Sequence, residues 1–103
     1  MWAQLITVHL KPGRDDDLPR LAEQLRAVEQ PDSGLLRSTM MRDAKDPALV
    51  RMLVVFESEE HARAREADPR RTEGLEVARA TMAELFDGPP EYADLTVVAD
   101  WTP

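Results

Sequence analysis

The chain has 103 residues, a formal net charge of −7 and no cysteine. This length fits one domain over residues 1–103, and the lack of cysteine excludes disulfides, thiolate metal sites and cysteine nucleophiles. The acidic balance argues against binding to nucleic acids or anionic membranes, because both attract an excess of lysine and arginine. No apolar run approaches the ~20 residues that span a bilayer, and no signal peptide is visible, so we expect a soluble cytoplasmic protein.

The N-terminal third is predicted to be a strand followed by a helix. Residues 2–10 are apolar on both faces of an extended segment, which is typical of a strand buried on both sides, and residues 11–13 (Lys-Pro-Gly) end it. Aspartates at 15–17 then precede apolar residues at helical spacing over 18–28. Acidic side chains favour the positive end of a helix dipole, and consecutive carboxylates point in different directions. A helix start is therefore preferred here over a metal site.

Two strands form the middle of the chain. Residues 35–42 carry apolar side chains on both parities, and a polar segment over 43–47 is predicted to be a hairpin connection. Residues 49–57 give the strongest strand pattern in the chain, and again both faces are apolar. We expect these two strands to pair with each other.

The following segment has the pattern of a broken helix. Ser58 is predicted to cap a helix over residues 59–67, and Asp68-Pro69 breaks or kinks it. A second helical stretch follows and contains Gly74, which costs roughly 1 kcal/mol relative to alanine at such a position. We expect this glycine to permit a close approach to the sheet or to a ligand.

A stop signal and a last strand complete the pattern. Residues 87–90 (Asp-Gly-Pro-Pro) are predicted to end the second helical stretch, and residues 92–101 alternate as a strand. The resulting order, βαββαβ, is that of the α+β ferredoxin-like fold, with an antiparallel sheet and the helices on one face.

The sheet face away from the helices has an unusual composition for a monomer. The first, third and last predicted strands keep apolar side chains on both parities, so this face would be a large exposed apolar patch. Such patches mark interfaces. We therefore expect a homodimer in which two sheets pack face to face.

At this point the chain resembles the antibiotic biosynthesis monooxygenase (ABM) family of dimeric α+β barrels. The resemblance covers nearly the whole chain and is carried by three junctions: residues 10–13 (Leu-Lys-Pro-Gly), residues 56–60 (Phe-Glu-Ser-Glu-Glu) and Asp68-Pro69. It implies a small-ligand cleft between the sheet and the helices of each subunit. The family includes quinone-forming monooxygenases that use no cofactor, haem-degrading enzymes and many members without a known role.

The polar residues of two branches of the family are absent from the matching positions. The resemblance to the haem-degrading branch would place an Asn, a Trp and a His at Ile6, Arg65 and Leu75, and leucine cannot ligate iron, which argues against haem degradation. The quinone-forming branch would place an Asn and a Trp at Met52 and Phe56. Neither branch's residues are present.

Five side chains remain as site candidates, each with a structural alternative. Arg65 stands where many members have a His, and it is permanently charged, so it would hold an anionic or enolate oxygen rather than act as a base. Its alternative is a solvated helix surface. Met52 and Phe56 would line the cleft or simply belong to the core. Tyr92 would orient a phenolic substrate or anchor its strand, and His9 would contact substrate or serve structure at the face or rim turned to a partner sheet.

Two functions follow as alternatives. The first is a monooxygenase with Arg65 as its catalytic residue and Met52, Phe56, Tyr92 and His9 as substrate contacts, acting on small aromatic or polyketide-like molecules without a cofactor or metal. The second is a non-catalytic dimer of the same fold that binds a small ligand or serves as a scaffold. Fold alone does not decide between them, because function belongs to sites.

Overall fold

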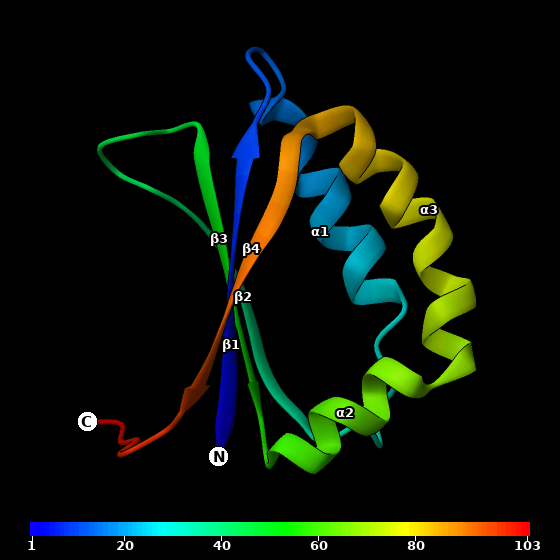
Figure 1. Cartoon of the computed structure of the whole chain (residues 1–103), viewed down its shortest axis with the longest axis vertical. Helices are drawn as coiled ribbons and strands as arrows, with labels where there is room; N and C mark the ends of the chain where they lie inside the picture. Colours follow the sequence, from blue (N-terminus) through cyan, green and yellow to red (C-terminus); the bar gives the residue numbers. More distant parts are fainter.

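Four strands form one antiparallel sheet in the order β2-β3-β1-β4, and the helices lie on one side of it (Figure 1). The computed structural model describes residues 1–103. Its elements are β1 (Trp2–Leu10), the 3₁₀ turn η1 (Asp15–Asp17), α1 (Leu18–Ala27), β2 (Leu35–Arg42), β3 (Leu49–Phe56), α2 (Glu59–Ala67), α3 (Pro69–Leu85) and β4 (Phe86–Thr96). The predicted α+β ferredoxin-like fold is confirmed, and none of its helices is both long and apolar enough to cross a membrane.

The predicted cap at Ser58 is confirmed, and the predicted break at Asp68-Pro69 is the start of a second, capped helix. The hydroxyl of Ser58 accepts the backbone N–H of His61 at 3.2 Å and caps α2. The carboxylate of Asp68 accepts the N–H of Arg70 at 2.9 Å and caps α3, where Pro69 takes a first-turn position that needs no N–H. The break between the two helices is thus a C-terminus and a capped N-terminus in succession.

The last strand overlaps the predicted one over residues 92–96 but begins and ends earlier in the chain. β4 begins at Phe86, directly after α3, and ends at Thr96, so residues 97–101 are not strand and Trp101 is 81% exposed. Residues 88–90 lie in a bulge, between the pairs His9–Asp87 and Thr7–Glu91. Because β4 is an edge strand, the two prolines in this bulge remove no ladder hydrogen bond, and a sequence read as a stop signal is tolerated within a strand.

The buried core consists of two separate clusters on the helix side of the sheet. The larger one joins β1 and β3 to α1 and α3, and it contains Leu10, Leu18, Leu21, Val50, Ala78 and Leu85. The smaller one lies at the other end of the sheet, against α2, and contains Trp2, Val54, Phe56 and Ala62. Between the two clusters, Ile6 and Met52 on the helix-facing side are half-buried.

Gly74 marks a close contact between two helices. A Cβ atom at this position would lie 2.6 Å from Cγ1 of Val28, the residue that follows α1. The close approach is therefore to the end of α1 and not to the sheet.

Candidate functional site

A cross-strand row of side chains lies on the helix-facing side of the sheet between the two core clusters. Ile6 pairs with Met52 of β3 and with Tyr92 of β4, and Met52 pairs in turn with Met40 of β2. Ile6, Met40 and Met52 are half-buried and Tyr92 is 62% exposed. Met52 packs against neither core cluster. The sequence-predicted residues Met52 and Tyr92 therefore share one row, in the layer between sheet and helices.

At the β2 end, the row reaches a cavity at the edge of the sheet. Met40 lines a cavity of about 270 Å³ between α1 and β2, together with Leu18, Pro19 and Ala22. The other end of the row is the exposed ring of Tyr92.

Arg65 and Phe56 meet at the far end of the sheet. The guanidinium carbon of Arg65 lies 5.1 Å from the centre of the Phe56 ring, a cation–π contact that links α2 to β3. Phe56 is buried, and three residues of β3 separate it from Met52. The structure thus brings Arg65 to Phe56, whereas Met52 and Tyr92 lie in a different row.

Glu29 binds Arg65, a contact that the sequence did not indicate. The carboxylate of Glu29 accepts Nε of Arg65 at 3.0 Å and also its Nη2, so the pair is bidentate. The side chain of Arg65 is 12% exposed and that of Glu29 is 22% exposed. The structural alternative for Arg65, a solvated helix surface, does not describe this environment.

A second arginine shares the same carboxylate. Nη1 of Arg71, on α3, lies 3.2 Å from Oε1 of Glu29, and the side chain of Arg71 is 15% exposed. Burial lowers the pKa of Arg71, and the nearby charges of Arg65 and Arg79 lower it further, while Glu29 raises it. Two guanidinium groups therefore share the carboxylate of Glu29 as hydrogen-bond acceptor, in an environment that is partly shielded from water. Glu29 and Arg65 are 36 positions apart in the sequence, which explains why no local spacing reveals this cluster.

Arg63 makes a second set of contacts between α2 and the sheet, near Trp2. Arg63 lies over the Trp2 ring, with its guanidinium carbon 5.2 Å from the ring centre, and it donates to Asp94 of β4 at 3.2 Å. Asp94 also accepts from Gln4 at 3.0 Å. Unlike Arg65, Arg63 is exposed, and it pairs with Glu59 and Glu66 on its own helix.

The two histidines lie apart from this layer. His9 is exposed and alternates with Val8 and Leu10, so it belongs to the sheet face away from the helices. Nδ1 of His61 lies 2.7 Å from the Ser58 hydroxyl, and Nε2 lies 3.3 Å from the Glu57 carboxylate. The His61 ring therefore belongs to the N-terminal end of α2. No group of three or more His, Asp and Glu side chains is placed to hold a metal ion.

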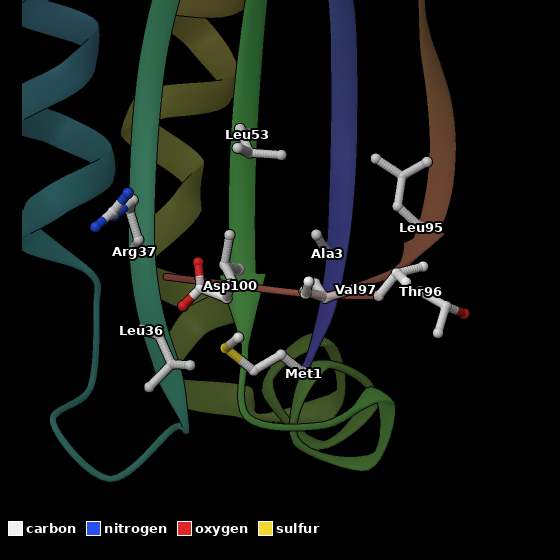
Figure 2. A pocket seen from close by; sticks show the side chains of 12 residues that line it. Met1, Ala3, Leu36, Arg37, Leu53, Leu95, Thr96, Val97 and Asp100 are labelled. Atoms are coloured by element: carbon white, nitrogen blue, oxygen red, sulfur yellow. The ribbon is translucent and has the colours of Figure 1, made fainter. Parts of the chain in front are cut away.

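The C-terminal segment crosses the open face of the sheet and encloses a second cavity (Figure 2). The N–H of Val97 donates to the carbonyl of Met1 at 3.3 Å, which fixes the start of the crossing. The cavity measures about 650 Å³ and is lined mostly by apolar residues, among them Ala3, Leu53 and Leu95. None of the five predicted site residues lines this cavity or the one beside β2.

Comparison with known proteins decides the family. The antibiotic biosynthesis monooxygenase family matches residues 1–76. The chain belongs to the antibiotic biosynthesis monooxygenase family. The match ends within α3, so it includes Arg65, Met52, Phe56 and His9 and does not include Tyr92. A search of curated proteins found no match.

Solved structures of family members have the same fold. A protein from Bordetella bronchiseptica is similar with a TM-score of 0.76 and 19% identity, over 95% of this chain and 97% of its own. One from Nitrosomonas europaea has a TM-score of 0.75 at 14% identity, over 96% and 100% of the two chains. One from Chloroflexus aurantiacus has a TM-score of 0.69 at 21% identity, over 99% and 98%. Their names assign them to the antibiotic biosynthesis monooxygenases and state no substrate.

Proposed function

We propose that the chain is a cytoplasmic homodimeric monooxygenase that oxidises small aromatic or polyketide-like substrates without a cofactor. The observation that carries this proposal is membership of the antibiotic biosynthesis monooxygenase family over residues 1–76. The half-buried row between the two core clusters supports it, because apolar surface with one polar end is typical of a small-ligand site.

In the proposed reaction the substrate supplies all the electrons. An acidic ring CH₂ group loses a proton, the resulting carbanion forms a C–O bond with O₂, and protonation gives a hydroperoxide. Loss of water from the hydroperoxide leaves a carbonyl, so CH₂ and O₂ become C=O and H₂O. The contribution of the protein is to stabilise the anion and to exclude water.

Arg65 is the proposed catalytic residue. Glu29 engages its Nε and Nη2, and its Nη1 makes no hydrogen bond within the protein. That nitrogen would stabilise the enolate oxygen by a charge-assisted hydrogen bond. Met52, Phe56 and Tyr92 are the proposed substrate contacts, with the Tyr92 hydroxyl orienting a phenolic group at the sheet edge.

The proposed dimer uses the sheet face away from the helices. Large apolar side chains on this side are left exposed, with Leu36 at 51%, Met41 at 41% and Leu95 at 41%. A second copy would cover them with the same face, because an isologous contact is self-complementary. For His9 we propose contact with a ligand near this interface, since it lies on the same face.

Oxygen uptake with anthrones, quinols and other phenols tests the proposed activity. We expect substrate-dependent consumption of one O₂ per carbonyl formed, and a loss of kcat on the order of 10²-fold in Arg65→Met, typical of removing an electrostatic contact to an oxyanion. Arg63→Met is the matched control, because it removes an arginine from the same helix that also lies over an aromatic ring. Uptake no higher than in protein-free solution would contradict the proposal.

The alternative is a dimer that binds a small ligand without turnover. It is favoured by Ile6, Met52, Phe56 and Leu75, which stand where better-known branches of the family carry polar side chains. Ligand-dependent increases in melting temperature without oxygen uptake are its expected signature. Such a result would leave the ligand site standing and remove the reaction.

A further inference from the structure

The cluster of Glu29, Arg65 and Arg71 carries more positive than negative charge. Arg79 of α3 adds to the positive potential at Arg71. These four groups sum to a charge of +2 in a chain whose net charge is −7. A local excess of this sign is unexpected in so acidic a chain, and its two central arginines are mostly buried.

The hydrogen-bonding capacity of the cluster is also in excess. Two guanidinium groups present roughly ten N–H donors, and Glu29 accepts from three of their nitrogens. Nε and Nη2 of Arg71 donate to no protein group. None of these unpartnered nitrogens is fully buried, so the N–H donors that Glu29 leaves free are accessible to an added anion.

We propose that Arg71, together with Arg65, binds the carboxylate of a small organic acid beside Glu29, and that the natural ligand of this protein is such an acid. A carboxylate fits because its two oxygens match the planar fork of a guanidinium group. The inference rests on the proposed function in one respect: the acid is the substrate whose anion Arg65, packed over the Phe56 ring, would stabilise.

Benzoate is the probe, and its neutral analogue benzamide is the control ligand. Binding is measured by isothermal titration at constant ionic strength set with sodium chloride. We expect saturable binding of benzoate and none of benzamide at the same concentrations, because only the charged group satisfies the arginines. Equal binding of both ligands, or no benzoate binding, would overturn the proposal.

Variants separate an anion site from a purely structural clamp. Arg71→Gln is expected to weaken benzoate binding about tenfold or more, as for loss of a charged hydrogen bond, and Arg71→Lys to recover part of the loss. Arg70→Gln removes the same charge one position away, where the side chain is exposed and bound to Asp68, and should change the affinity less than about twofold. Unchanged affinity in Arg71→Gln would overturn the proposal.

Glu29→Gln gives the sharpest distinction. Removing the competing carboxylate should tighten benzoate binding while lowering the melting temperature of the free protein. A clamp without a ligand role predicts the loss of stability alone, so no gain in affinity would count against the site. Oxygen uptake plays no part in these measurements, and an inactive protein that binds benzoate in this pattern would contradict the monooxygenase while supporting the anion site.

Discussion

The two faces of the sheet carry similar apolar side chains but are buried to very different degrees. Every buried residue of the sheet except Ala3 lies on the helix-facing side, where Val50, Val54 and Phe56 are at most 4% exposed. On the other face, the C-terminal segment is the only cover, and Leu95 remains 41% exposed. Alternation in a strand therefore shows which residues share a face, and the elements that pack on that face determine the burial.

The largest expected effect is on the free energy of unfolding, and it is seen by comparing a leucine on the helix side of the sheet with one on the open face. Leu85 is fully buried in the larger cluster, so Leu85→Ala should lower the free energy of unfolding by about 2–5 kcal/mol through lost contacts and a cavity. Leu53→Ala, on the half-buried open face, should cost under about 1.5 kcal/mol at high dilution. Urea titrations at two protein concentrations measure both, and comparable losses at high dilution would break the contrast between the faces.

The next effect, on dimer dissociation, tests whether a second copy of the chain covers the sheet face away from the helices. Leu53→Lys places a charge at the centre of the proposed interface, so we expect the dimer to dissociate about 100-fold more readily, since an unpaired buried charge costs several kcal/mol. Sedimentation velocity at micromolar concentration should show a dimer for the original chain and a monomer for the variant. Lys45→Glu, in the exposed hairpin, is the control, and a monomeric original chain would refute the dimer.

A smaller effect lies within the helix layer. Gly74→Ala gains up to about 1 kcal/mol of helix propensity but places its methyl group 2.6 Å from Cγ1 of Val28. Valine is stiff, so overpacking should prevail and leave a net loss of about 1 kcal/mol. In a Val28→Ala background the same change should stabilise the chain, as measured by thermal unfolding. A loss that persists there would show that contact with Val28 is not the reason for glycine.

The sequence predicted the elements whose signals are local and missed the contacts that are not. Ser58 was predicted to cap a helix and Asp68-Pro69 to break it, and the structure shows the Ser58 cap and a second helix start at Asp68. Pro89 and Pro90 were interpreted as a stop signal but lie within β4. Proline is tolerated there because β4 is an edge strand, and that position is set by the tertiary structure. Glu29 was overlooked for the same reason: its partners lie 36 and 42 residues away, and only the packing of α2 and α3 beside the end of α1 brings them together.

The smallest effect belongs to the hairpin between β2 and β3. Arg51 donates to Asp43 at 2.7 Å, and this hydrogen bond, with the N–H groups of Asp46 and Lys45, lowers the pKa of the Asp43 carboxyl to about 2. Because the pKa is depressed in the folded state, the ionised form stabilises the fold fully above about pH 4, near the unfolded value. That contribution to the free energy of unfolding should fade as the pH falls toward 2.

The variant Asp43→Asn lacks this ionisable carboxyl. The difference in urea midpoint between the original chain and the variant should therefore shrink from pH 4 to pH 2. A difference that stays constant from pH 6 to pH 2 would show that the carboxylate charge contributes nothing at this end of the open face.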